Sequence, residues 1–458
     1  MNRVVPTDVS FVSVSERDIA ATNKIARKAV RAAMIGNFVE WFDYGIFGYM
    51  APVIATIFFP SEDRTAALMM TYAVLAMTLF FRPLGGIYFG RMADKLGRKK
   101  VLATTILIMA AATGAVGLLP THAQLGTLAP VLLILCRLVQ GFAAGGEYAG
   151  AVTFVVEYGP PKKRAFYASF VGVSVFLGLF AGSGLVGYLS HALPSESLTS
   201  WGWRIPFLLS IPVGAIGFYI RMKLEDTPEF KKVLQTGNVE SAPLRDALST
   251  QWRNMGIFFS FAICNAVASY LFSSYLTTYL IEVANHTKPD ALFSNSIALV
   301  VLCCILPAGG LLADRYGRKP MILTASIFAA IIAVPAFIIA GMSGFGVVVI
   351  AQLLFMMIFF FITPSVTVSM AEMFPASVRV TAGAISYNLA FTLFGGTTPF
   401  ISTALVEFTG NKLAPAYYLV GVALFTTVAV ALFYRERSGA SPELDEKEYI
   451  SGWPNNEL

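Results

Sequence analysis

The amino-acid sequence predicts an all-α membrane protein whose twelve transmembrane helices form two pseudo-symmetric bundles of six. Of its 458 residues, 56% are hydrophobic and only 13% are charged, whereas soluble domains carry about 25% charged residues. Twelve apolar runs are long enough to cross a bilayer, which takes about 20 residues each. A charged loop occurs twice at matched positions, which indicates that the chain is two similar halves.

The polar segments divide the chain into five parts. A polar arm (1–29) precedes the first half (30–221), and a hydrophilic loop (222–254) leads to the second half (255–434) and a polar tail (435–458). The arm is too polar to be a cleavable signal peptide. The predicted spans are 33–58, 67–90, 101–119, 130–157, 166–190 and 204–221, then 255–282, 291–313, 321–341, 345–371, 381–406 and 416–434.

The repeated loop places glycine, aspartate, arginine and lysine at equal offsets. The first copy runs from Gly90 to Lys99, and the second runs from Gly310 to Lys319. Its glycines permit a tight turn, and each aspartate can pair with a helix N-terminus or a basic neighbour. A basic turn that only sets topology is the alternative. We expect gating roles for Gly90, Asp94, Gly97, Arg98, Asp314, Gly317 and Arg318.

A second repeat supports the two halves. Glu157 and Arg164 end the fourth span with the same spacing as Glu372 and Arg379 at the end of the tenth. A segment rich in small residues follows each copy, and small residues let helices approach closely. We therefore expect these four charged residues near the inner gate, beside central helices on which the halves rock.

Basic residues predict the orientation. With both termini inside, the inner segments hold 27 of the 33 Lys and Arg residues, and the outer side holds four. Such a bias places the termini in the cytoplasm. The remaining two, Arg82 and Arg137, fall inside predicted spans.

Carboxylates inside the membrane are candidate proton carriers, because buried charges are costly and mark functional sites. Glu40 and Asp43 are three residues apart and share a helix face, which Asn37 and Tyr44 extend. Glu147 lies among glycines in the fourth span. We expect Asp43 or Glu40 to couple a proton, with Glu147 as a further candidate. Structural pairing with a neighbouring helix is the alternative for each.

Arg82 and Arg137 are candidate ligands for a substrate carboxylate, which an arginine can bind through two hydrogen bonds. Arg82 is favoured, because Pro83 and two glycines leave backbone and space open beside it. Neutralising a carboxylate within the protein is the alternative for both. Aromatic and amide side chains that could line a pocket include Tyr148, Tyr270, Tyr275 and Asn388, although most such tyrosines serve helix contacts.

The sequence motifs do not support an enzyme function. The three histidines lie at predicted outer ends or loops, and no nucleotide-binding, nucleophile or metal-ligand motif is present. We read the four cysteines as small hydrophobic residues. We therefore expect no catalytic residue, metal or cofactor, with a proton as coupling ion, and no nucleic-acid partner.

The motif set resembles a known family. The paired loops are similar to those of the major facilitator superfamily, and the arginine in Arg137-Leu-Val-Gln-Gly resembles its fourth-helix motif. Asn37 to Asp43, Arg82 to Gly86, Gly145 to Tyr148 and Trp201 to Phe207 resemble the metabolite:proton symporter family. That resemblance implies uptake of a small organic solute with a proton across a bacterial inner membrane. It places Arg82 near the substrate and Glu40, Asp43 and Glu147 near the coupling path.

These motifs do not determine which solute is transported. The family includes carriers of proline and betaine, of citrate and 2-oxoglutarate, and of shikimate. The segment 145–158 looks most like the proline/betaine carriers, and 394–406 looks more like the citrate carriers. We expect alternating access by a monomer in the lipid bilayer. A proton-driven antiporter that exports a drug-like compound is the main alternative.

Overall fold

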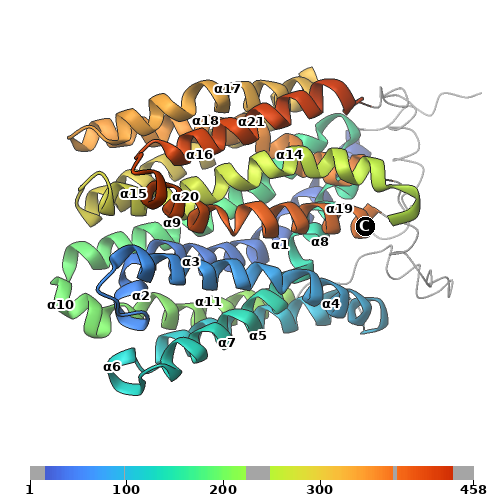
Figure 1. The fold of residues 1–458 in the computed structure, drawn as a ribbon. Helices are drawn as coiled ribbons and strands as arrows, with labels where there is room; N and C mark the ends of the chain where they lie inside the picture. The colour runs from blue at the N-terminus through green and yellow to red at the C-terminus, as the bar shows by residue number, and fades with distance from the viewer. Residues whose placement is uncertain (1–15, 97, 223–247, 375–378, 437–458) are drawn as a thin grey trace, which may run out of the picture.

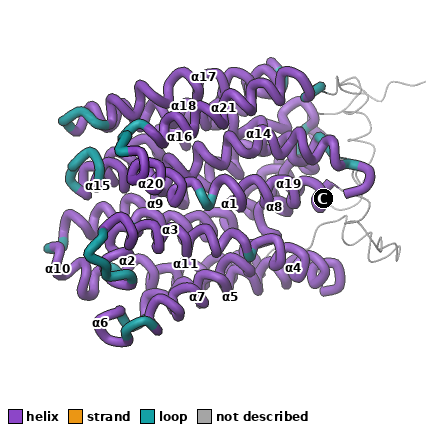
Figure 2. Tube along the Cα trace, viewed as in Figure 1, coloured by secondary structure: helices purple, strands orange, loops and turns teal. Residues whose placement is uncertain are grey.

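The computed structural model describes residues 16–96, 98–222, 248–374 and 379–436, and every regular element in these ranges is a helix (Figure 1; Figure 2). The helices run side by side in two groups. In Figure 1 the blue-to-green helices of the first half lie below the yellow-to-red helices of the second half.

Six spans form the first half. The first combines α1 (Glu16–Tyr49) with α2 (Ala51–Phe58), and the second combines α3 (Arg64–Phe80) with α4 (Arg82–Leu96). The others are α5 (Arg98–Leu118), then α7 (Leu128–Ala143), η1 (Ala144–Gly146) and α8 (Glu147–Tyr158), then α9 (Arg164–Ala192) and α11 (Arg204–Met222). The short connecting elements are α6 (His122–Leu125), η2 (Pro161–Lys163), α10 (Ser195–Ser197) and η3 (Leu198–Gly202).

Six spans also form the second half. The seventh span is α14 (Trp252–Tyr270), η4 (Leu271–Tyr275) and α15 (Leu276–Glu282). It is followed by α16 (Lys288–Tyr316), α17 (Arg318–Ala340) and α18 (Phe345–Glu372). The last two spans are α19 (Arg379–Ala390) with η5 (Phe391–Gly395) and α20 (Thr398–Thr409), and α21 (Ala414–Phe433).

The prediction of twelve membrane-spanning helices is confirmed. Nine helical stretches of the described chain are long and apolar enough to cross a bilayer. The shorter apolar helices 103–118 and 204–219 occupy the third and sixth positions, and α1 with α2 occupies the first. One difference concerns the arm: α1 already begins at Glu16, inside the predicted polar arm. Most of the predicted central loop and tail lies outside the described residues.

Four of the described spans are interrupted near their middles, where the sequence predicts continuous runs, and the first is interrupted at Met50 between α1 and α2. The break between α3 and α4 falls just before Pro83, whose ring cannot continue the backbone hydrogen-bond ladder. A 3₁₀ turn, η1, interrupts the fourth span, and π-helical turns η4 and η5 interrupt the seventh and eleventh. Such turns are frequent at functional sites, and each of the three contacts the other half: η1 through Asn388, η4 through α1 and η5 through α3.

Glycines bring the second and fourth spans unusually close together. A Cβ at Gly85 would lie 1.7 Å from the Phe142 carbonyl oxygen, and a Cβ at Gly145 would lie 2.0 Å from the Arg82 carbonyl oxygen. No side chain fits at either position. The close contact therefore fixes the backbone of Arg82 against η1.

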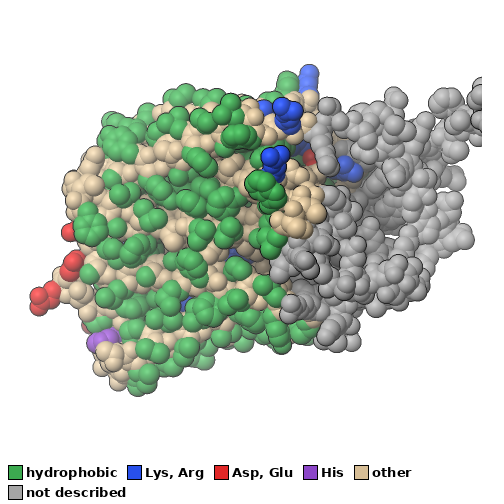
Figure 3. Space-filling model, turned by 45° about the vertical axis from the view of Figure 1, so that its right-hand side comes forward, with side chains coloured by type: hydrophobic (Ala, Val, Ile, Leu, Met, Phe, Trp, Pro, Cys, Tyr) green, Lys and Arg blue, Asp and Glu red, His purple; other side chains and the backbone are tan. Residues whose placement is uncertain are grey.

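The two ends of the bundle differ in charge. We call the end that carries Glu16 and Glu436 the terminal face, and the end that carries α6 and α10 the opposite face. Lys and Arg side chains gather beside the terminal face, acidic groups and histidine appear at the other end, and hydrophobic side chains cover the surface between them (Figure 3). This distribution is typical of a protein embedded in a bilayer.

Candidate functional site

Two buried ion pairs lie side by side at the centre of the first half. Glu40 of α1 pairs with Arg82 of α4, and the Arg82 Nη2 also lies 3.3 Å from the Ala144 carbonyl oxygen. The side chains of Glu40 and Arg82 are 0% and 2% exposed, so neither charge is solvated by bulk water. Opposite charges must compensate each other at such a site.

The second pair forms one helical turn farther along α1. Arg137 Nη1 of α7 lies 3.8 Å from Asp43 Oδ2, and Gln140 links the two side chains. Gln140 accepts a hydrogen bond from Arg137 at 2.7 Å and donates to both carboxylate oxygens of Asp43 at 2.9 and 3.1 Å. It also donates to Thr113 of α5. This network joins α1, α5 and α7 around Asp43.

The Tyr44 ring lies between the two arginines. Each guanidinium carbon, that of Arg82 and that of Arg137, is 5.5 Å from its centroid, and Arg137 also stacks over Phe47 at 4.2 Å. Tyr270 of α14 approaches from the second half, close enough to interact electrostatically with Tyr44 and both arginines. We call Tyr44, Arg82, Arg137 and Tyr270 the donor cluster.

Several hydrogen-bond donors in the donor cluster lack an acceptor. Within the described chain, no acceptor lies within reach of the hydroxyls of Tyr44 and Tyr270, the Nε atoms of both arginines, or the Nη2 of Arg137. Leaving a buried donor unsatisfied costs about 1–3 kcal/mol each. A group with two acceptor oxygens and a negative charge would satisfy this set.

A row of stacked rings adjoins the donor cluster. Tyr148 of α8 stacks on Tyr387 of α19 with centroids 4.6 Å apart, and Tyr387 stacks on Phe391 at 4.1 Å. The Tyr148 hydroxyl lies 3.2 Å from that of Thr367 on α18. Asn388 donates to the Gly145 carbonyl oxygen at 3.2 Å. The structure thus brings Tyr148, Tyr270 and Asn388 to the boundary between the halves.

Other predicted site residues lie elsewhere. Asn37 donates at 3.0 Å to the Val171 carbonyl oxygen and to Ser174, so it joins α1 to α9. Tyr275 donates to the Ser402 carbonyl oxygen at 3.4 Å, nearer the opposite face. Glu147 is buried at the first residue of α8.

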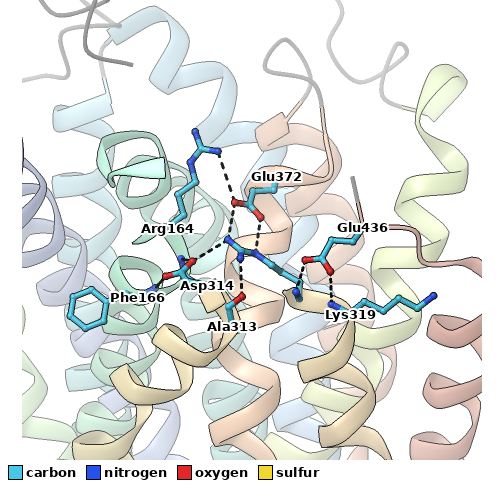
Figure 4. A network of polar contacts seen from close by, with 9 residues as sticks. Arg164, Phe166, Ala313, Asp314, Lys319, Glu372 and Glu436 are labelled. Atoms are coloured by element: carbon cyan, nitrogen blue, oxygen red, sulfur yellow. Dashed lines mark hydrogen bonds and ion pairs between the residues drawn. The ribbon is translucent and has the colours of Figure 1, made fainter. Parts of the chain in front are cut away.

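The second copy of the repeated loop ties the halves together at the terminal face. Asp314 accepts hydrogen bonds from the backbone N–H groups of Ala165 and Phe166 at 3.0 and 2.9 Å, and it pairs with Arg318 at 3.2 Å. Arg318 also binds both oxygens of Glu372, at 3.1 and 3.2 Å. Arg164 lies 4.0 Å from Glu372 (Figure 4). Both predicted partners of the aspartate, a helix N-terminus and a basic neighbour, are therefore present.

The first copy cannot be compared in the same way. Gly97 lies outside the described residues, and so do the side chains of Asp94, Arg98, Glu157 and Arg379; Gly90 is described only as part of the α4 backbone. Gly317 of the second copy has φ +95°, and a Cβ there would lie 2.6 Å from a carboxylate oxygen of Glu436. The positive φ at this turn favours glycine.

The opposite face is closed as well. Arg64 of α3 donates two hydrogen bonds to Glu282 of α15, at 2.8 and 3.3 Å, and Tyr72 donates to Thr278 at 2.7 Å. Because contacts between the halves exist at both faces and at the centre, this conformation encloses the donor cluster.

Some of these residues were missed by sequence reasoning. Gln140 stands three residues after Arg137, a spacing that puts both on one helix face, so its role could have been proposed. Thr113 and the Arg64–Glu282 pair gave no such signal, because one sequence does not reveal which helices meet.

Comparison with known proteins identifies the family. The model of the Major Facilitator Superfamily matches residues 33–396. A proline/betaine transporter of Salmonella typhimurium is 35% identical over 442 residues, which cover 93% of this chain and 88% of that protein. A glycine betaine/proline/ectoine/pipecolic acid transporter, OusA, of Dickeya dadantii is 33% identical over 430 residues, covering 91% and 85%.

Solved structures show the same fold. The proton:xylose symporter XylE bound to a sugar analogue aligns with a TM-score of 0.69 and 16% identity, over 90% of this chain and 95% of that one. XylE from E. coli in a partially occluded, inward-open conformation aligns with a TM-score of 0.70 and 15% identity, over 90% and 99%. The chain belongs to the Major Facilitator Superfamily and is a multi-pass membrane transporter, not an enzyme.

Proposed function

We propose that this transporter carries a small zwitterion, of the proline or betaine type, into the cell together with a proton. The observation that carries this proposal is the donor cluster, where two arginines and two tyrosines present unsatisfied donors in a buried site. A carboxylate supplies the acceptors that this set lacks. The names of the relatives support the same solute class.

Proton coupling would use the carboxylates that already hold the arginines. Protonation of Glu40 removes its charge and weakens its hold on Arg82, which can then turn toward the solute carboxylate. Asp43 stands in the same relation to Arg137 through Gln140. Glu147 is a third candidate. Binding of the solute and of the proton would then favour each other. The proton neutralises Glu40 and so releases Arg82, and the solute carboxylate then compensates the charge of Arg82.

Alternating access would follow from breaking one closed face at a time. The contacts of Asp314 with the start of α9 and of Glu372 with Arg164 hold the terminal face, and the Arg64–Glu282 pair holds the opposite face. Opening one while the other persists exposes the donor cluster to one side only. The gating residues of the first loop copy would act in the same way.

For orientation, the excess of Lys and Arg at the terminal face supports a cytoplasmic location for both termini. We propose that the protein works as a monomer in a bacterial inner membrane, since one chain contains both halves and the whole donor cluster. The proton is the coupling ion, and no cofactor takes part.

Uptake into proteoliposomes tests the proposal. Labelled proline, glycine betaine, citrate, 2-oxoglutarate and shikimate are offered in parallel under an inward proton gradient. Accumulation of proline or betaine that an uncoupler abolishes is the expected result. Export of solute under the same gradient would favour the antiporter. Accumulation of citrate alone would keep the symporter and overturn the solute class.

A further inference from the structure

The Tyr148–Tyr387 ring pair is a contact that must change when the halves move. Tyr148 belongs to the first half, and Tyr387 and Phe391 belong to the second. The planes of Tyr148 and Tyr387 differ by only 14°, so the two rings present their faces to each other. Both residues are buried, at 5% and 3% exposure. Separation of the halves would leave two parallel aromatic faces with a space between them.

The electrostatic surroundings of this ring pair favour a cation. Glu40 lies close enough to interact with both rings, and Arg82 is close to Tyr387. Once Arg82 is paired with the solute carboxylate, its charge no longer opposes a cation beside Tyr387. The faces of the rings carry negative potential, so the space between them suits a cation.

The distance between the two groups of a zwitterion also fits. In proline or betaine a single carbon separates the carboxylate from the ammonium nitrogen, so their two binding sites must adjoin. The donor cluster and the ring pair satisfy this requirement, because Arg82 is close to Tyr270 in the cluster and to Tyr387 in the ring pair.

We propose that the ammonium end of the solute binds between the facing rings of Tyr148 and Tyr387, and that Tyr387 determines the preference for N-methylated ammonium groups. This inference rests on the proposed function, because it assumes a zwitterion whose carboxylate is held by the donor cluster. An N-methylated ammonium has few or no N–H donors to satisfy and spreads its charge over its methyl groups. Aromatic faces bind such cations well, whereas a primary ammonium would lose strong hydration.

The same arrangement links binding to closure. In this structure the halves meet ring against ring, and the protein with bound solute would close with ring, cation and ring. The solute would then touch both halves at once, with Tyr148 on one side and Tyr387 on the other. Phe391, stacked behind Tyr387 at 4.1 Å, supports that ring from the second half.

The experiment compares glycine betaine with 3,3-dimethylbutanoate, in which a neutral carbon replaces the ammonium nitrogen. Both compete against labelled proline in proteoliposomes. The variants are Tyr387→Leu, Tyr148→Leu and Tyr387→Phe. Tyr279→Leu is the matched control, because Tyr279 is an equally buried tyrosine that packs edge-on against Phe337 within the second half.

We expect wild type, Tyr387→Phe and Tyr279→Leu to favour betaine over its isostere on the order of ten-fold, the size of a desolvated cation–π contact. Tyr387→Leu and Tyr148→Leu should bind the two competitors about equally. Loss of packing alone would weaken both ligands and leave their ratio unchanged. If a leucine variant no longer transports, the ratio is measured by ligand-dependent thermal stabilisation of the purified protein.

The experiment distinguishes failure of the proposed function from failure of the inference about the Tyr148–Tyr387 ring pair. If wild type takes up neither proline nor betaine, the proposed function fails and the inference fails with it. If wild type takes up proline but the leucine variants keep the full ratio, or wild type shows no preference for betaine, the proposed function stands and the ring-pair inference is overturned.

Discussion

Asp314 on the eighth span caps the start of α9 in the other half by accepting a hydrogen bond from the Phe166 backbone N–H at 2.9 Å. The contact joins an acidic side chain to the positive end of a helix, an interaction that stabilises by about 0.3–1 kcal/mol when exposed and up to about 2 when partly buried. It lies where the halves must separate for the terminal face to open.

Asp314→Asn should therefore open the terminal face more often. Spin labels at Lys162 and Arg315, exposed positions on the two halves, would report the change as a growing population at longer distance. The expected population shift is several-fold, since about 1.4 kcal/mol corresponds to ten-fold. Asp290→Asn is the control, because Asp290 contacts Thr287 within its own helix. Equal distance distributions in Asp314→Asn and wild type would contradict the assignment.

The Arg64–Glu282 pair should act similarly at the opposite face. Arg64→Gln should increase opening there by a few-fold, since an exposed ion pair contributes only about 0.2–1 kcal/mol. Labels at the exposed residues Glu62 and Phe408 would measure it. The exchanged pair Arg64→Glu with Glu282→Arg should restore the closed population. No recovery in the exchanged pair would show that other contacts close this face.

Removing the Glu40–Arg82 ion pair as a whole should have opposite effects on stability, which recovers, and on transport, which does not. Glu40→Gln leaves Arg82 as a buried charge without compensation, which should lower stability by about 3–5 kcal/mol. Adding Arg82→Met should recover much of that stability, measured by thermal unfolding in detergent. Transport should stay abolished in the double variant. A double variant that regains uptake would exclude Arg82 from solute binding.

The close contact between the second and fourth spans gives a steric test. Gly145→Ala would place a methyl group 2.0 Å from the Arg82 carbonyl oxygen and should destabilise the protein by about 1–3 kcal/mol or more. Gly150→Ala, in α8 of the same span with open space around it, should be neutral or slightly stabilising. Comparable melting temperatures for the two variants would contradict the packing of η1 against α4.

Much of the fold is predictable because a lipid bilayer allows only a few kinds of membrane-spanning structure. The spans follow from apolar length, and the division into halves follows from the repeated loop. Glu40 and Asp43 are predicted together from their three-residue spacing, and Asp314 is expected to pair with a helix N-terminus or with a basic neighbour. These inferences need only local sequence and the cost of buried charge.

Contacts between helices were not predictable in the same way. No feature of the local sequence indicates that Glu40 pairs with Arg82 and Asp43 with Arg137, since either arginine is a suitable partner for either carboxylate. The π-helical turns η4 and η5 were missed because their sequences contain ordinary helix-compatible residues. The start of α1 at Glu16 was missed because polar residues continue a helix beyond the membrane without any apolar signal.

The location of all four charges of the central ion pairs in the first half has an evolutionary consequence. Glu40, Asp43, Arg82 and Arg137 move together as one body, and the second half contributes uncharged side chains such as Tyr270, Tyr387 and Asn388 to the boundary. Substitutions in the second half can therefore alter the shape of the site without disturbing its charge balance. During evolution, the transported solute of such a protein can therefore change while the residues that couple transport to the proton stay the same.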